Sequence, residues 1–168
     1  MLIYPDLYCD NVRTINIEFL REHRIQGLIL DVDNTLIDFD RKFEEGTVEW
    51  VQALKQAGIK FCIVSNTNKV DKVKYVADTL DIPYFYFAKK PLKKGFLQAK
   101  EKMGLDAKNI ATVGDQIMTD VIGANRCGMY SILVKPIADK DIFITKIKRP
   151  IENKIIKSYL KKMKKEKV

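Results

Sequence analysis

The apolar run from Leu28 to Leu30 ends directly in two acidic residues, Asp31 and Asp33. A short apolar run of this kind predicts a buried strand, and open parallel α/β sheets bind ligands at the carboxyl ends of their strands. Alternation along an extended strand points both aspartates to one side, so their charges converge unless a cation, a proton or a turn separates them. Asp33 and the polar residues after it could instead cap a helix or form a turn. Taken alone, the pair leaves these two readings open.

A second acidic cluster favours a metal or catalytic site over a cap. Gly114 and Asp115 follow the apolar run that ends at Val113, and Asp120 lies in the turn or helix start beyond them. Two predicted strands would then deliver carboxylates to the same edge of one sheet.

Two further predicted strands end in polar residues of other kinds. The strand at 59–64 stops at Ser65 and Asn66, which could cap the next helix or donate hydrogen bonds to an anion; capping is the commoner role for an asparagine taken singly. The strand at 83–87 is followed by Lys89 and Lys90 before a proline. Taken alone, two lysines before a proline indicate an ordinary solvated loop. The pair becomes informative only through its position after the other polar clusters along the chain.

That order of an acid pair, a Ser-Asn-Thr cluster, a Lys-Pro pair and a Gly-Asp pair with a second Asp resembles the four motifs of the haloacid-dehalogenase-like phosphohydrolases. The segments 31–36, 88–91 and 114–126 look like the YqeG-type branch of subfamily IIIA, to which phosphatidylglycerophosphate phosphatases are related. The resemblance covers residues 1–150 and fades in the tail. Lys90, which immediately precedes Pro91, matches the family lysine better than Lys89 does.

The resemblance implies a phosphatase mechanism with a covalent intermediate. Asp31 would attack phosphorus to form an aspartyl-phosphate, which splits one difficult displacement into two easier ones. Asp33 would protonate the leaving oxygen and then activate water, while its backbone carbonyl would bind Mg²⁺ together with the carboxylates of Asp31 and Asp115. Mg²⁺ is the expected cofactor because a hard cation must neutralise charge when a carboxylate approaches a phosphate monoester.

The remaining motif residues would bind and orient the phosphoryl group. The resemblance assigns Ser65, Asn66 and Lys90 to its oxygens, where charge spreads in the transition state. Asp120 would support the metal site and orient Lys90.

The alternation of helical and strand patterns predicts an α/β fold, a doubly wound parallel sheet of the Rossmannoid type that the family has. The intervals between the motifs hold no room for a cap domain, so the site should be open to bulky substrates. The aromatic run at 84–87 reads as a buried strand rather than a binding platform. Helices are expected at 13–23, 47–57, 69–80 and 93–103, and strands at 27–32, 59–64, 83–87, 110–114 and 129–134.

The basic charge of the chain lies in its tail. Residues 141–168 carry ten Lys or Arg against three acids, a net of +7, whereas the whole chain has a net charge of +8. From Pro150 onward, apolar residues recur at helical spacing with lysines between them, which predicts an amphipathic helix. We therefore divide the chain into a phosphatase domain at 1–140 and a tail at 141–168. The apolar stripe could pack on the domain, or the tail could bind anionic lipid, at about 1 kcal/mol per basic residue near the surface.

These features predict a Mg²⁺-dependent phosphomonoester hydrolase whose substrate is phosphatidylglycerophosphate, an anionic phospholipid. A soluble or protein phosphosubstrate is one alternative. A non-enzymatic, nucleic-acid-associated protein that uses the tail is another, but acid clusters would repel a polyanion and no nucleic-acid module is visible. Without an export signal or a membrane-spanning run, a cytoplasmic location is expected, with peripheral contact at the inner face of the membrane left open.

Overall fold

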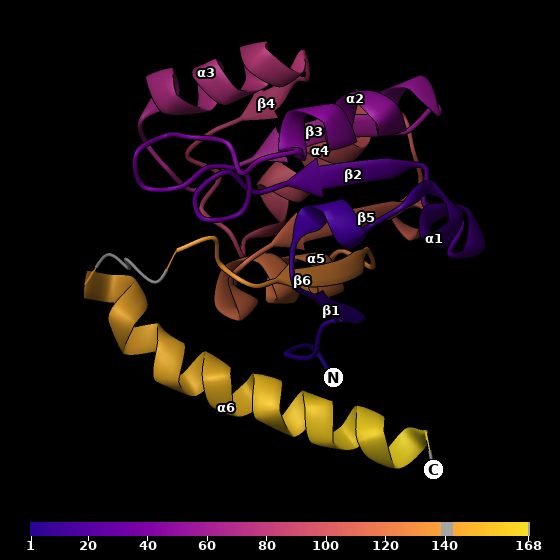
Figure 1. Cartoon of the computed structure of the whole chain (residues 1–168), viewed down its shortest axis with the longest axis vertical. Coiled ribbons are helices and arrows are strands. Elements are labelled where there is room, and N and C mark those ends of the chain that lie inside the picture. Colours follow the sequence, from indigo (N-terminus) through magenta and orange to yellow (C-terminus); the bar gives the residue numbers. More distant parts are fainter. Residues whose placement is uncertain (139–142, 168) are drawn as a thin grey trace.

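Six parallel strands form a single sheet in the computed structural model, which describes residues 1–138 and 143–167 (Figure 1). The order across the sheet is β1-β6-β5-β2-β3-β4, so β2 lies near the centre between β5 and β3. The strands are β1 (Leu7–Cys9), β2 (Gly27–Leu30), β3 (Lys60–Val64), β4 (Tyr84–Phe85), β5 (Ile110–Gly114) and β6 (Tyr130–Val134). The predicted doubly wound parallel sheet is confirmed, and no inserted cap domain interrupts the described chain.

Helices cover both faces of the sheet because side chains alternate along each strand. Leu28 and Leu30 of β2 belong to the core under the first three helices, and Ile29 between them points to the core under α4 and α5. The helices are α1 (Ile17–Glu22), α2 (Thr47–Gln56), α3 (Val70–Leu80), α4 (Lys93–Met103), α5 (Ile122–Arg126) and α6 (Phe143–Glu166). The strands are therefore buried on both sides, as parallel sheets require.

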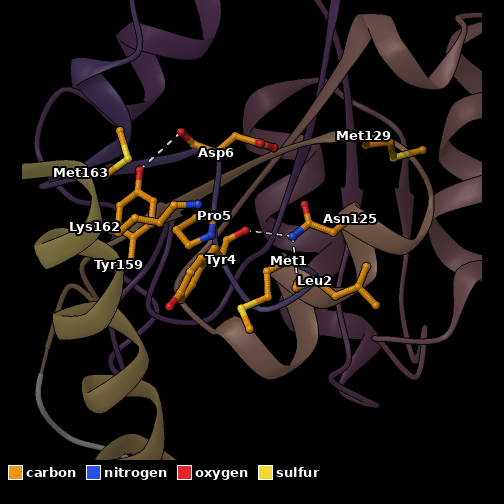
Figure 2. A pocket seen from close by; sticks show the side chains of 10 residues that line it. All are labelled: Met1, Leu2, Tyr4, Pro5, Asp6, Asn125, Met129, Tyr159, Lys162 and Met163. Carbon is orange, nitrogen blue, oxygen red and sulfur yellow. Dashed lines mark hydrogen bonds between the residues drawn. The ribbon is translucent and has the colours of Figure 1, made fainter. Parts of the chain in front are cut away.

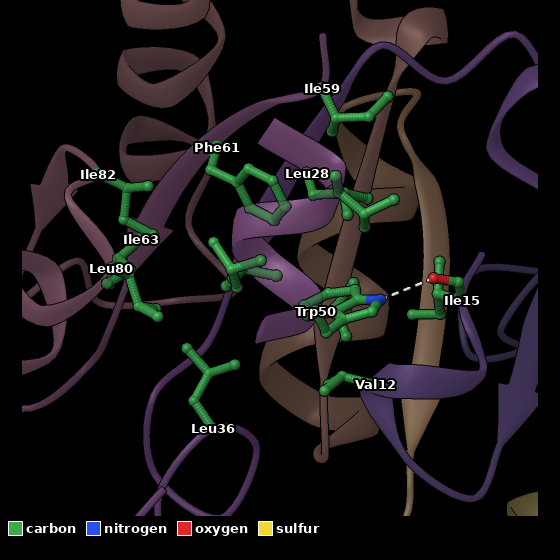
Figure 3. Packing of buried hydrophobic residues seen from close by; sticks show 14 of the residues in the cluster. Val12, Ile15, Leu28, Leu36, Trp50, Ile59, Phe61, Ile63, Leu80 and Ile82 are labelled. Carbon is green, nitrogen blue, oxygen red and sulfur yellow. Dashed lines mark hydrogen bonds between the residues drawn. The ribbon is translucent and has the colours of Figure 1, made fainter. Parts of the chain in front are cut away.

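Trp50 of α2 belongs to the larger core cluster (Figure 3). Its ring packs edge-on against Phe61, with ring centroids 6.0 Å apart. Its indole N–H donates a 2.7 Å hydrogen bond to the backbone carbonyl of Ile15, which lies in the segment before α1. This bond joins the N-terminal segment to α2 and satisfies a buried polar group that would otherwise be costly.

Two expected elements differ from the structure. The helix expected at 13–23 is a 3₁₀ turn at Val12–Thr14 followed by α1, because Asn16 accepts a hydrogen bond from the Phe19 N–H and starts a new helix. The expectation of a buried aromatic strand at 84–87 is wrong. Tyr84 and Phe85 form β4 but are only half-buried, whereas Tyr86 and Phe87 lie beyond it and are 45% and 54% exposed, since β4 is an edge strand that ends there.

The tail helix α6 begins before Pro150 and packs along the domain. Ile155 and Ile156 contact the cluster around Leu133 of β6, and Tyr159 is 8% exposed. Part of the apolar stripe therefore packs on the domain, whereas Ile151 and Leu160 are 54% and 41% exposed, and most of the described lysines of α6 face outward. The expected boundary between residues 140 and 141 lies outside the described residues. Within the described chain, no helix combines the length and the apolar character that crossing a bilayer demands.

We expect Trp50→Phe to lower the free energy of unfolding by about 2–4 kcal/mol, because it leaves the Ile15 carbonyl without its donor and shrinks a core side chain. Urea denaturation followed by circular dichroism measures this change. Phe39→Leu serves as the control, since Phe39 is 67% exposed. Equal midpoints for Trp50→Phe and the unsubstituted chain would contradict the role given to this bond.

Candidate active site

The carboxyl ends of neighbouring strands bring the predicted site residues to one edge of the sheet. Asp31 follows β2, Ser65 follows β3 and Asp115 follows β5, while the loop after β4 carries Lys90. The backbone N–H of Asp31 donates to the carbonyl of Val113 at 2.9 Å, so pairing with β5 continues to the point where the acidic residues begin. The register of the sheet thus sets the spacing of the site.

Lys90 is the centre of this arrangement. Its Nζ donates to Oδ1 of Asp31 at 2.9 Å and to Oδ1 of Asp120 at 2.6 Å. The lysine side chain is 3% exposed and those of the two aspartates 12% and 5%. Burial alone would lower the pKa of Lys90, but the charges of Asp120 and Asp31 outweigh it and raise the pKa above its usual value. The two carboxylates therefore favour the charged ammonium.

Three carboxylates converge beside this ammonium. Oxygens of Asp31, Asp115 and Asp120 all lie within 4.8 Å of one another. Burial, followed by repulsion from neighbouring carboxylates, raises the pKa of Asp115 to about 6, and the pKa of Asp31 is also raised, first by burial. A bound divalent cation would remove this repulsion, because it favours the charged form of every ligand.

The turn after β5 holds Asp120 close to the strand end. Asp120 lies in a five-residue π-helical turn, Ile117–Val121, and its Oδ2 accepts from the N–H of Gln116 at 3.2 Å. A Cβ on Gly114 would lie 2.2 Å from the Asp120 carboxyl carbon, so only glycine leaves room for this carboxylate. Thr35, from the first motif, donates to Oδ1 of Asp115 at 3.3 Å.

Asn66 acts on the backbone of Lys90. Its Oδ1 accepts from the Lys90 N–H at 2.6 Å, and its Nδ2 donates to the Lys90 carbonyl at 3.1 Å. Asn66 does not cap α3, whose N-cap residue is Lys69 and has no side-chain cap bond. Ser65 is 1% exposed, and its hydroxyl accepts from the Thr67 N–H at 3.3 Å. Lys89 points elsewhere, with its Nζ 5.0 Å from the centre of the Phe87 ring.

Asp33 differs from Asp31 in its exposure to solvent. Its side chain is 50% exposed, and its carboxylate pairs with Lys72 of α3 at 2.5 Å. Sequence reasoning did not find Lys72, because a lysine on the polar side of a helix carries no sign of the loop that it contacts. The open position of Asp33 allows exchange of protons with solvent and with a leaving group.

The tail helix also reaches the site, which sequence reasoning missed. Arg149 pairs with Oδ2 of Asp115 at 2.7 Å, and Glu152 accepts from the N–H of Met118 at 3.1 Å. Both residues stood among many charges of the tail, and nothing in their spacing set them apart.

Two cavities lie beside α6 at opposite ends of the helix. One of 340 Å³ adjoins the site, since Asp115 and Arg149 are among its lining residues. The other, of 620 Å³, lies between the N-terminal segment and the last turns of α6, with Tyr4, Asn125 and Tyr159 on its wall (Figure 2). Its wall includes residues just before β1 and β6, at the amino edge of the sheet, and none of the predicted site residues.

Known proteins are similar to this chain in sequence and in fold. The family of haloacid dehalogenase-like hydrolases matches residues 44–128. The probable phosphatase YqeG of Bacillus subtilis is 40% identical over 159 residues, which are 94% of this chain and 92% of that protein. The chloroplastic phosphatidylglycerophosphate phosphatase 1 of Chlamydomonas reinhardtii is 23% identical over 81% of this chain, which spans 54% of that protein.

Solved structures show the same fold. A putative subfamily III A hydrolase of the HAD superfamily from Legionella pneumophila has a TM-score of 0.54 at 23% identity, over 68% of each chain. The cobalt-bound deoxy-D-mannose-octulosonate 8-phosphate phosphatase of Haemophilus influenzae has a TM-score of 0.55 at 21% identity, over 73% of this chain and 71% of that one. Together with the match to YqeG along almost the whole chain, these findings show that the protein belongs to the haloacid dehalogenase-like hydrolases and is a phosphatase of that superfamily.

Proposed function

We propose that this phosphatase hydrolyses phosphomonoesters with Mg²⁺, through an aspartyl-phosphate formed on Asp31. The observation that carries the proposal is the placement of Asp31. Its carboxylate accepts from the buried ammonium of Lys90 at 2.9 Å, and oxygens of Asp115 and Asp120 lie within 4.8 Å of it. A nucleophile in this position has beside it both a cation for the phosphoryl oxygens and acidic ligands for a metal.

The donor set fits Mg²⁺. All three groups are carboxylates, which are hard oxygen ligands, and their burial among like charges favours a small divalent cation. The carboxylates of Asp31 and Asp115 and the backbone carbonyl of Asp33 would hold the ion. When bound, Mg²⁺ would neutralise the charge between the nucleophile and the phosphate.

The protein groups then carry out two displacements. An oxygen of Asp31 bonds to phosphorus as the ester bond breaks, and Asp33 gives its proton to the leaving oxygen. In the second step Asp33 takes a proton from water, the water oxygen bonds to phosphorus, and Asp31 leaves as a free carboxylate with release of inorganic phosphate. Lys90 and Ser65 would bind the phosphoryl oxygens.

The supporting side chains would keep Lys90 in place. Asp120 accepts from its ammonium, and Asn66 holds its peptide group on both sides. We therefore propose that Asn66 acts mainly through Lys90, in addition to the phosphate contact that the motif implies.

We expect Asp31→Asn to abolish both the hydrolysis of an aryl phosphate and the formation of the aspartyl-phosphate, because an amide cannot serve as the nucleophile. Release of the aryl alcohol with and without Mg²⁺ and intact mass after acid quench measure the two effects. Asp81→Asn is the matched control, since the Asp81 side chain is 97% exposed. Undiminished turnover in Asp31→Asn would rule out the mechanism.

Lys90→Met should lower kcat by about 10²–10³-fold, since a charged donor aimed at the transferring phosphoryl group is lost. Lys89→Met, one residue away, should keep most of the activity, because its Nζ lies over the Phe87 ring. Steady-state kinetics of the two variants, with circular dichroism to verify folding, decide between the two lysines. Greater damage from Lys89→Met would overturn the assignment of Lys90.

For the natural substrate we propose phosphatidylglycerophosphate, with the enzyme cytoplasmic and peripheral at the inner face of the membrane. The similarity to the Chlamydomonas phosphatase and the absence of a cap over the described site support this substrate. The outward face of α6 supports contact with anionic lipid. Because Ile155, Ile156 and Tyr159 are engaged with the domain, lysines would provide most of the attraction, at about 1 kcal/mol each. The exposed lysines of this face are Lys154, Lys157, Lys161, Lys164 and Lys165.

Replacing these five lysines with glutamine should reduce turnover of phosphatidylglycerophosphate in anionic vesicles and leave turnover of a soluble aryl phosphate unchanged. Added salt should mimic the replacement for the unsubstituted enzyme, because it screens surface charge. This variant is sharper than removal of α6, which would uncover Leu133 and its neighbours. Failure of the intact enzyme to hydrolyse the lipid, with turnover of soluble phosphomonoesters instead, would favour the soluble-substrate alternative.

A further inference from the structure

We propose that Arg149 and Glu152, on α6, are positioning residues that hold the loop bearing Asp115 and Asp120 in the geometry that binds Mg²⁺. The inference rests on the proposed metal site and adds a part of the chain that the sequence motifs do not include. The loop in question runs from Asp115 to Val121, and α6 begins 22 residues after the end of this loop.

Arg149 donates two hydrogen bonds to Asp115. Its Nη2 donates to the carboxylate oxygen Oδ2 at 2.7 Å, and its Nη1 donates to the backbone carbonyl of the same residue at 3.0 Å. The arginine side chain is 15% exposed and that of Asp115 is 1% exposed. A planar guanidinium that bonds to both the backbone and the side chain fixes the peptide and the carboxylate together.

Glu152 accepts a hydrogen bond from the next turn of the same loop. Its side chain is 2% exposed, and Oε1 accepts from the N–H of Met118 at 3.1 Å. Met118 lies in the π-helical turn that carries Asp120. Oε2 of Glu152 lies 3.6 Å from Nη1 of Arg149, so one ion pair on one helical turn contacts the start and the middle of the loop.

Docking of α6 does not by itself account for these buried charges. Farther along the helix, Ile155 and Ile156 pack against the domain, and the Tyr159 hydroxyl donates to the Asp6 carbonyl at 3.4 Å. Buried ion pairs contribute little net stability compared with apolar packing, so a helix that needed only an anchor would gain as much from a leucine. What Arg149 and Glu152 specifically contribute is to orient the loop from Asp115 to Val121.

Loss of Arg149 would act on Mg²⁺ in two opposing ways. It would remove a positive charge near the ion, and it would free the Asp115 carboxylate to turn away from Asp120 and Asp31. We expect the second effect to prevail, because outer partners of metal ligands typically contribute about 10–100-fold to metal affinity.

Isothermal titration of Mg²⁺ into the metal-free, full-length protein tests this inference without an activity assay. Arg149→Met and Glu152→Leu should each weaken Mg²⁺ binding by about 10–100-fold. Arg149→Lys should recover part of the affinity, because it keeps the charge but not the two-point fork. Glu152→Gln should recover most of it, because its carbonyl oxygen still accepts from Met118.

Tyr159→Leu is the matched control, since it loosens α6 at the end far from the site. It should lower the melting temperature and leave the Mg²⁺ affinity unchanged. If Tyr159→Leu weakens binding as much as Arg149→Met does, the pair only docks the helix and the inference is wrong. Mg²⁺ binding as tight as in the unsubstituted protein for both Arg149→Met and Glu152→Leu would also overturn it.

Two further results separate this inference from the proposed function. If the unsubstituted protein binds no Mg²⁺, the proposed metal site itself fails. If Arg149→Met or Glu152→Leu does not fold, as judged by circular dichroism, Arg149→Lys and Glu152→Gln carry the test. Unchanged affinity in Arg149→Lys would then overturn the positioning role of Arg149, since the lysine lacks the fork.

Discussion

The buried ammonium of Lys90 between Asp31 and Asp120 is the interaction on which the rest of the site depends. A lone lysine in this position would lose its charge, and three carboxylates without it would repel one another and take up protons. Together they form a polar network in which each charge requires the others. The surrounding structure serves this network. Asn66 fixes the lysine backbone, Gly114 leaves space for Asp120, and Thr35 donates to Asp115.

The parallel sheet makes such a network feasible. The carboxyl ends of the strands lie side by side at one edge of the sheet. Polar residues in the first one or two positions after each strand therefore come together, even when they are far apart in sequence. The strands are rigid because they are buried on both faces, and a rigid frame holds charges at fixed distances more accurately than a loop scaffold does. The same geometry leaves the edge uncovered, in keeping with a phosphatase that has no cap in its described chain.

The sequence predicted the features that depend on neighbouring residues in the chain, and it missed the features that depend on contacts between distant segments. Apolar runs closed by Asp31, Ser65 and Asp115 predicted three strands and the edge where they end, because strand burial and the polar residues after it are adjacent in the chain. The short strand β1 gave no such signal, since it exists only through pairing with β6. The aromatic run after Pro83 predicted too much strand, because composition does not reveal that β4 lies at the edge. Arg149 and Lys72 were invisible for a related reason, since their partners are chosen by helix packing and not by spacing.

The position of β1 has a consequence for how the protein folds during its synthesis on the ribosome. Residues 7–9 are made long before their partners in β6, residues 132–134, and β2 near the centre of the sheet pairs with β5 at 110–114, which is also made much later. Contacts between such distant parts of a chain form slowly, because the loop between them must close first. The strand that ends at Asp31 therefore leaves the ribosome long before the residues that complete its surroundings. A nascent chain at that stage has Asp31 without Asp115, Asp120 or α6, so the network around Lys90 can form only after these later residues have been made.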